Sequence, residues 1–146
     1  MPFWDSNTGP FLYAHRGANR EFPENTIEAF RRAVELGADV LELDIHPTKD
    51  GVFVVSHDDS GARNAGNPAR IGDRDWSEVR AWDAGWGFED EPGSHPFRGK
   101  DCRIPRFDAV LEMFHDMPLN VDVKHATAPQ LQGLLDVIRN AHATER

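Results

Sequence analysis

Two acidic residues, Glu42 and Asp44, alternate with Leu41, Leu43 and Ile45 in one short segment. Because successive side chains of a strand point to opposite faces, an extended conformation puts both carboxylates on one face and the aliphatic side chains on the other. At about 3.3 Å of rise per residue, the two carboxylates start roughly 6.6 Å apart. Their oxygens can converge on one divalent cation. The simpler alternative is a half-buried strand whose acids only face water.

Four further short motifs accompany this segment in a fixed order. The set consists of Ala14-His15-Arg16-Gly17, Pro23-Glu24-Asn25-Thr26, Glu42-Leu43-Asp44, Thr48-Lys49-Asp50-Gly51 and His57-Asp58. In order and spacing it resembles the signature of the glycerophosphodiester phosphodiesterase family, whose relatives include phosphatidylinositol-specific phospholipase C. The resemblance runs from about Tyr13 to Lys124. It implies hydrolysis of glycerophosphodiesters to an alcohol and sn-glycerol 3-phosphate.

Cleavage of a phosphodiester requires a base for the nucleophile, an acid for the leaving alkoxide and positive charge near the phosphoryl oxygens. The resemblance implies that His15 and His57 divide the acid and base roles, and we favour His15 as the base and His57 as the acid. Arg16 suits a bidentate contact with phosphate that lysine would not reproduce. Lys124 is a second candidate phosphate ligand, although it could instead pair only with Asp122.

Three carboxylates, those of Glu42, Asp44 and Asp122, are the candidate metal ligands. Hard oxygen donors suit Mg²⁺ or Ca²⁺ better than zinc, which prefers nitrogen and sulfur. The expected cofactor is therefore a divalent cation, Mg²⁺ or Ca²⁺, which also offsets the repulsion between the acids. The resembled family usually has Glu-x-Lys where this chain has Asp122-Val123-Lys124, so a shorter side chain has to reach the same metal.

The elements that must position these groups can be read from apolar runs and capping residues. Strands are predicted over residues 11–14, 40–46, 52–56 and 120–124. Helices are predicted from an N-cap at Asn25 to Gly37, from Pro105 onward, and over a last amphipathic segment with Leu131, Leu134, Leu135 and Ile138. This order predicts an α/β fold, the first half of a TIM-type (β/α)8 barrel, whose functional groups stand at the C-terminal strand ends.

The link between the second and third predicted strands is too short for a crossover helix, which needs about a dozen residues. Either the chain returns extended, or the two strands pair antiparallel. A two-residue turn over Lys49-Asp50 would then place Glu42 opposite His57. Both arrangements bring His57 to the rim that carries the carboxylates.

An insertion of about residues 59–103 is rich in Gly, Pro, Asp, Asn and Arg. Only Asp75 to Trp82 is typical of a short capped helix, and the segment looks too irregular for a core of its own. In the resembled family, an insertion here folds over the mouth of the barrel. Trp86 and Phe88 are therefore candidates for a pocket wall, although large aromatic side chains often only anchor a loop.

Composition narrows the possible partners. The net charge of −9 argues against a nucleic-acid backbone and against anionic membrane surfaces. Cys102 is the only cysteine, so no disulfide can form within the chain, and a reduced cytoplasm is the expected location. Residues 1–6 lack the pattern of a signal peptide, and no apolar run approaches the roughly 20 residues of a membrane helix.

The 146 residues are about half of what a full barrel takes, which is roughly 250 residues. We treat residues 1–146 as one truncated phosphodiesterase domain with four barrel strands. Its open edges and an apolar interior predict self-association or pairing with a complementing second half. A lysophospholipase D is the rival enzyme, which the polar insertion disfavours. A non-catalytic half-barrel remnant is the rival from another class.

Overall fold

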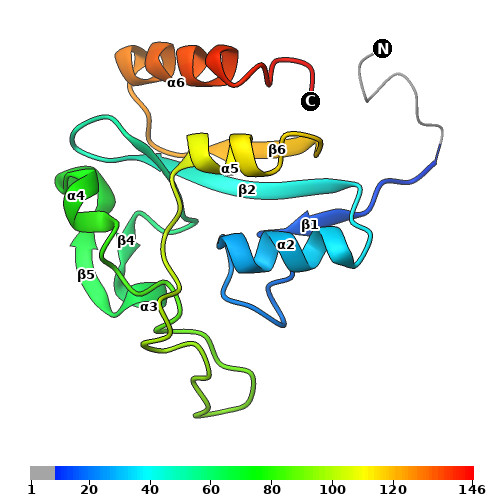
Figure 1. Ribbon diagram of the computed structural model, residues 1–146. Helices are drawn as coiled ribbons and strands as arrows, with labels where there is room; N and C mark the ends of the chain where they lie inside the picture. The colour runs from blue at the N-terminus through cyan, green and yellow to red at the C-terminus, as the bar shows by residue number, and fades with distance from the viewer. Residues whose placement is uncertain (1–8) are drawn as a thin grey trace.

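The computed structural model describes residues 9–146, and its centre is a four-stranded sheet (Figure 1). β2 (Val40–Pro47) lies in the middle. β1 (Tyr13–His15) and β6 (Leu119–Val123) pair with β2 in parallel on opposite edges. β3 (Phe53–Val55) pairs with the C-terminal end of β2 in the antiparallel direction. The fold is thus the predicted α/β type, with three parallel strands, and the third predicted strand, β3, takes the antiparallel one of the two arrangements that the sequence left open.

The turn between β2 and β3 settles the pairing that the sequence left open. Ile45 lies opposite Val55, and the Thr48 amide donates to the Val52 carbonyl at 2.9 Å. The turn therefore has three residues and ends at Gly51, whose φ of +83° favours glycine. The predicted two-residue turn was wrong by one residue. The residue opposite Asp44 is Ser56, so Glu42 does not face His57.

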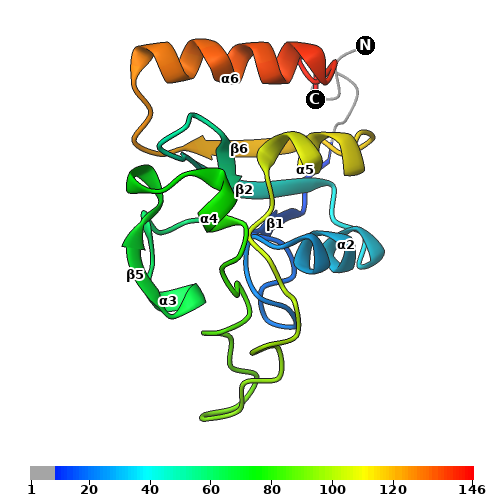
Figure 2. The same ribbon diagram turned by 60° about the vertical axis from the view of Figure 1, so that its left-hand side comes forward.

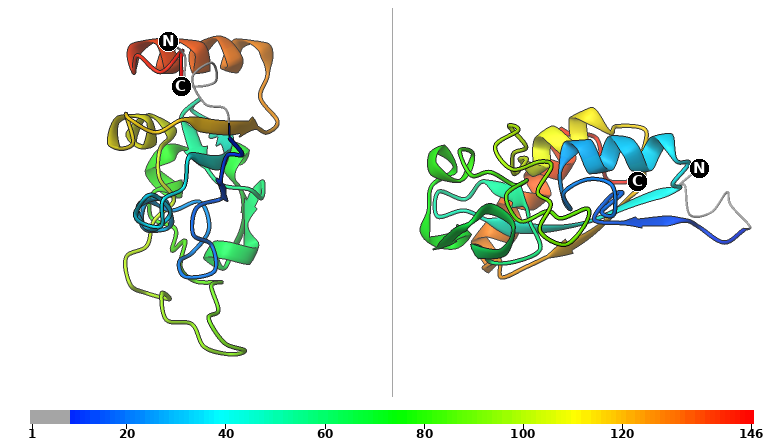
Figure 3. Two further views of the ribbon diagram at one scale, coloured as in Figure 1. Left: turned by 90° about the vertical axis from the view of Figure 1, so that its right-hand side faces the viewer. Right: turned by 90° about the horizontal axis from the view of Figure 1, so that it is seen from below.

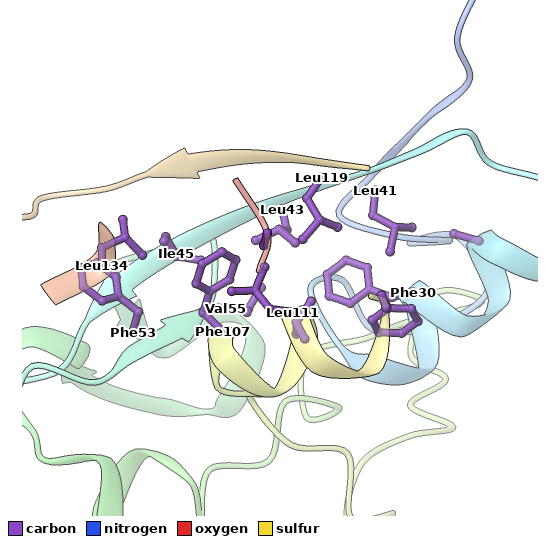
Figure 4. Packing of buried hydrophobic residues seen from close by; sticks show 14 residues of the cluster. Phe30, Leu41, Leu43, Ile45, Phe53, Val55, Phe107, Leu111, Leu119 and Leu134 are labelled. Carbon is purple, nitrogen blue, oxygen red and sulfur yellow. The ribbon is translucent and has the colours of Figure 1, made fainter. Parts of the chain in front are cut away.

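Three helices cover one face of the sheet: α2 (Ile27–Glu35), α5 (Phe107–Met113) and α6 (Ala128–Asn140) (Figure 3). The aliphatic side chains of β2 pack against them, as the alternation of residue types predicts. The shared core includes Phe30, Leu41, Leu43, Ile45, Phe107, Leu111 and Leu134 (Figure 4). The acidic residues of β2 therefore face the side that these helices leave open.

Two predicted helix starts were wrong by one or two residues. Thr26, not Asn25, caps α2, because its hydroxyl accepts the Ala29 amide at 3.3 Å. The second helix starts at Phe107, after Pro105, whose carbonyl instead accepts the Val55 amide at 2.9 Å. Asn25 and Pro105 each bond to a strand instead, Asn25 to Asp44 of β2 and Pro105 to Val55 of β3.

The insertion is more regular than predicted. Much of it extends below the sheet in Figure 2, while Arg70 and Asp73 line a cavity together with Thr127 and Gln130 at the start of α6. The insertion contains β4 (Ser60–Gly61), α3 (Ala62–Ala65), β5 (Asn67–Arg70), the 3₁₀ turn η1 (Ile71–Asp73) and α4 (Trp76–Val79). It also has a hydrophobic cluster of its own, which corrects the expectation of a coreless segment. That cluster joins Val54, Ile71, Val79, Trp82, Ala84, Cys102 and Ile104.

The open face of the sheet is polar, which corrects the prediction of an apolar interior. Tyr13 and His15 of β1 and Asn120 and Asp122 of β6 are exposed there, whereas Val121 packs against the helix-covered core. Exposed aliphatic side chains lie instead at the two flanks, on Leu12 and Leu36 beside β1 and on Leu131 and Leu135 of α6.

None of the helices within residues 9–146 is long and apolar enough to cross a membrane. The expectation about residues 1–6 falls outside the described residues. The cytoplasmic location stays a prediction.

Candidate active site

The registers of the parallel strands bring four of the predicted site residues onto the open face. His15 lies beside Glu42, and Asp122 lies beside Asp44. Register partners on neighbouring strands point their side chains to the same face. Strand pairing therefore builds a compact polar patch from residues that are up to 107 positions apart in the chain.

Asp44 is the buried centre of this patch, with only 2% of the residue exposed. Its carboxylate lies 3.4 Å from Arg16 Nε and 3.4 Å from Lys124 Nζ, and it accepts a 3.1 Å hydrogen bond from Asn25 Nδ2. A buried carboxylate is costly unless it is paired and hydrogen-bonded. Two cations and an amide thus compensate the negative charge of Asp44.

The backbone around Arg16 is held in an uncommon conformation. Arg16 and Asn25 have φ values of +57° and +58°, and the Asn25 amide donates to the Arg16 carbonyl at 2.9 Å. Non-glycine residues in this region cost on the order of 1–3 kcal/mol and are concentrated at functional sites. The Arg16 amide also donates to Glu42 Oε2 at 3.0 Å. These contacts fix Arg16 in front of the carboxylates.

Arg16 Nε is buried, and no hydrogen-bond partner meets it within the described part of the chain. The 3.4 Å contact with Asp44 is close enough for an ion pair but is not a hydrogen bond. A buried N–H donor without an acceptor is uncommon in folded proteins. Arg16 Nε is closed off from solvent and faces the Asp44 carboxylate, so its positive charge offsets the charge of that buried carboxylate.

The candidate metal ligands share one face, but their oxygens are engaged by protein groups. Lys124 bonds to Asp122 while it approaches Asp44, and the hydrogen bond from Lys124 to Asp122 is the main reason that the pKa of Lys124 is raised. Among residues 9–146, no three His, Cys, Asp or Glu side chains are grouped closely enough to hold a metal ion. The donor chemistry of Glu42, Asp44 and Asp122 fits a hard cation, and in this structure the Lys124 ammonium pairs with two of these carboxylates.

His57 follows β3 and is oriented by its neighbour. Its Nδ1 lies 2.8 Å from Asp58 Oδ1, so the contact with Asp58 orients the imidazole ring through Nδ1. Hydrogen bonds from the Arg63 guanidinium are the largest cause that lowers the pKa of Asp58 to about 2, and the hydrogen bond from His57 adds to it. Asp58 is therefore an ionised acceptor at neutral pH.

Glu24 lies between the sheet and the insertion. It pairs with Arg16 at 3.3 Å and with Arg63 at 2.7 Å, and it accepts a hydrogen bond from Asn64. Burial alone would raise the pKa of Glu24, but Arg63, Asn64 and Arg16 together lower it below its usual value. Glu24 thus remains charged and ties Arg16 to the insertion.

The two aromatic candidates for a pocket wall lie in different surroundings. Phe88 lines a small polar cavity of about 170 Å³ together with Glu24 and Arg63. Trp86 does not line it. Its indole covers Gly66, where an added Cβ would come within 2.6 Å of the ring, and Arg98 stacks over it at 4.5 Å.

Sequence reasoning missed Glu24, Asn25, Asp58 and Arg63 as site residues. The first three stand inside the motifs quoted above, so their place in those motifs was the available signal. Asn25 was assigned to a helix cap, although its side chain binds Asp44. Arg63 carried no signal, because a lone arginine in a polar loop is usually a solvated charge.

A mostly parallel sheet with helices on one face, and with His15, carboxylates and two basic groups on the other, defines half of an α/β barrel. The chain belongs to the glycerophosphoryl diester phosphodiesterase family, whose sequence model matches residues 15–139. It is 41% identical over 115 residues to the glycerophosphodiester phosphodiesterase of Caldanaerobacter subterraneus subsp. tengcongensis, covering 77% of this chain and 44% of that protein. It is 40% identical over 111 residues to human lysophospholipase D GDPD1, covering 76% and 35%.

Solved structures agree with this assignment. The glycerophosphoryl diester phosphodiesterase domain of Mycobacterium tuberculosis Rv2277c matches with a TM-score of 0.85 at 28% identity, over 95% of this chain and 51% of that one. The glycerophosphodiester phosphodiesterase of Agrobacterium tumefaciens str. C58 matches with a TM-score of 0.81 at 32% identity, over 92% and 55%. This chain therefore spans about half, or less, of the relatives that it matches.

Proposed function

We propose that this chain carries the catalytic half of a metal-dependent phosphodiesterase that hydrolyses glycerophosphodiesters to an alcohol and sn-glycerol 3-phosphate. The observation that supports this most directly is the convergence of Arg16 and Lys124 on Asp44, on the face that also presents His15. A guanidinium held in this way is suited to a phosphoryl oxygen. Family membership supplies the class of substrate.

In the proposed mechanism, Arg16 binds the phosphoryl group and Lys124 supplies a second positive charge. His15 takes the proton of the attacking nucleophile as the P–O bond forms. His57, oriented through Nδ1 by Asp58, gives a proton from Nε2 to the leaving alkoxide. A divalent cation held by Glu42, Asp44 and Asp122 would supply Lewis-acid stabilisation of the phosphoryl oxygens.

The direct test follows glycerophosphocholine by ³¹P NMR with millimolar Mg²⁺ or Ca²⁺, because substrate and product phosphorus give separate signals. We expect signal from sn-glycerol 3-phosphate to grow with the wild-type chain and to be lost with chelator. His57→Ala serves as the inactive control. A chain that folds, binds the cation and releases no product at any concentration would favour the non-catalytic remnant.

A lysophospholipase D activity is the second candidate, because human GDPD1, which carries that name, is nearly as similar to this chain as the bacterial phosphodiesterase. The cavity beside Phe88 is small and mainly polar, which suits a glycerol group better than an acyl chain. Parallel assays with glycerophosphocholine and lysophosphatidylcholine separate the two. We expect the substrate without an acyl chain to be preferred.

We further propose that the half barrel works as an assembly, either with a second copy or with a separate complementing half. Within residues 9–146, the outer edges of β1 and β6 pair with no further strand. These edges and the exposed leucines at both flanks support this proposal. Mass photometry and the hydrolysis assay on the same samples test it. We expect specific activity to rise with protein concentration, and a monomer of constant specific activity would contradict the proposal.

A further inference from the structure

Arg63, in helix α3 of the insertion, holds two carboxylates with one guanidinium. Its NH1 and NH2 donate to the two oxygens of Glu24 at 3.0 and 2.7 Å. Its Nε and NH2 donate to the two oxygens of Asp58 at 2.8 and 3.0 Å. Both contacts are bidentate, a geometry that the planar arginine fork allows and lysine does not.

Each of these carboxylates also holds a residue of the proposed active site. Asp58 Oδ1 bonds to His57 Nδ1 at 2.8 Å, and Glu24 Oε1 pairs with Arg16 NH1 at 3.3 Å. Arg63 thus connects the proposed acid to the proposed phosphate ligand through a continuous chain of hydrogen bonds. Without Arg63, two ionised carboxylates would face each other and repel.

Other residues of the insertion pack closely against helix α3, which carries Arg63. An added Cβ at Gly87 would come within 2.0 Å of the Arg63 carbonyl, and the Gly87 amide donates to the Asn64 carbonyl at 3.1 Å. Gly66, which ends α3 with φ +62°, lies directly under the Trp86 indole. The segment around Trp86 therefore packs against the short helix that carries Arg63.

We propose that Arg63 is a positioning residue that fixes the His57 ring and the Arg16 guanidinium relative to each other. The proposal rests on the proposed function in one respect, the roles given to His57 and Arg16. It assigns the insertion a task in the chemistry, because the insertion supplies the group that joins the two sides of the site. Arg63 itself acts through Asp58 and Glu24.

The test is NMR of ¹⁵N-histidine-labelled protein, in which the Nδ1 proton of His57 reports the bond to Asp58; the His57→Ala spectrum assigns the signal. Arg63→Met should speed exchange of this proton with water by about tenfold or more, as expected when a hydrogen bond to an ordered, ionised acceptor is weakened. Arg70→Met is the matched control, because Arg70 lies in the same insertion and, among the described residues, its ion pair is with Asp59 and not with Asp58 or Glu24. An unchanged His57 signal in folded Arg63→Met would overturn the proposal.

Should Arg63→Met not fold, Arg63→Lys decides the matter, because it keeps the charge and loses the two bidentate contacts. We expect about threefold faster exchange in this variant, and wild-type exchange would refute the positioning role.

The spectra also separate the two proposals. If the wild type hydrolyses nothing while the His57 signal depends on Arg63, the function is wrong and the positioning role stands. If Arg63→Met matches the wild type in kcat and in the signal, the positioning role is wrong and the function stands.

Discussion

A divalent cation should compete with the Lys124 ammonium for the same carboxylate oxygens. Lys124 Nζ lies 3.4 Å from Asp44 and bonds to Asp122, while Glu42 stands on the same face two residues before Asp44. Replacing Lys124 with methionine keeps the length and apolar stem of the side chain and removes the charge. We therefore expect Lys124→Met to bind Mg²⁺ or Ca²⁺ more tightly than the wild type.

The size of the effect follows from charge and mass action. A unit charge about 4 Å away is worth about 4 kcal/mol at an effective dielectric constant of 20, and solvent reduces this near the surface. Lys124 is 26% exposed, so a gain of roughly tenfold in affinity is a reasonable expectation. A cation at 100 times its Kd stabilises the folded state by about 2.7 kcal/mol. In a domain of this size, that raises Tm by roughly 8 °C.

Thermal unfolding over a titration of Mg²⁺ and of Ca²⁺ provides the assay. We expect Tm of Lys124→Met to begin to rise at about one tenth of the cation concentration that the wild type needs. Glu42→Gln, which keeps an oxygen for the Arg16 amide, should lose most of the shift, whereas Glu35→Gln on the far side of α2 should keep it. If Tm responds to about 10 mM of neither ion, in the wild type and in Lys124→Met alike, the metal site is refuted.

Three further outcomes are expected. His15→Ala and His57→Ala should each lower the hydrolysis rate in the ³¹P assay by about 10² to 10⁴, the usual effect of removing a general acid or base. Arg16→Lys should raise KM and lower kcat in steady-state kinetics, because the bidentate contact is lost. The Asp58 pKa of about 2 lies below the roughly 3.9 of an unfolded chain, so its stabilisation is complete above about pH 4 and lost as the pH falls toward 2. Urea midpoints between pH 6 and pH 2.5 should show that loss in the wild type and less of it in Arg63→Met.

The central strand could be predicted because its residue types carry two signals at once. Leu41, Leu43 and Ile45 mark the covered face, and Glu42 and Asp44 mark the open one, so alternation alone fixes both the element and its orientation. The parallel pairing with β1 and β6 then follows from the order of elements. Both inferences rest on local sequence patterns and on the order of the elements, and neither requires knowledge of a contact between distant residues.

The features that escaped prediction depend on contacts between distant segments. Asn25 and Thr26 are both good caps, and the choice between them was made by Asp44, which takes the Asn25 amide. The turn before β3 gained a residue because glycine at position 51 accepts a positive φ, which a three-residue turn can use. Local sequence propensity favours the alternative caps and turn lengths almost equally, and contacts between distant segments select one of them.

The polar open face changes what a completing partner would do for this chain. An apolar interior would drive association by burial, but here the patch around Asp44 is already satisfied by Arg16, Lys124 and Asn25. Association would rest instead on the free edges of β1 and β6 and on the leucines at the flanks. Association would exclude water from the site. Because this lowers the local dielectric constant, each charge interaction that Arg16 makes would become stronger. If Arg16 and Lys124 bind phosphate as proposed, a second half would therefore act mainly on the strength of that binding.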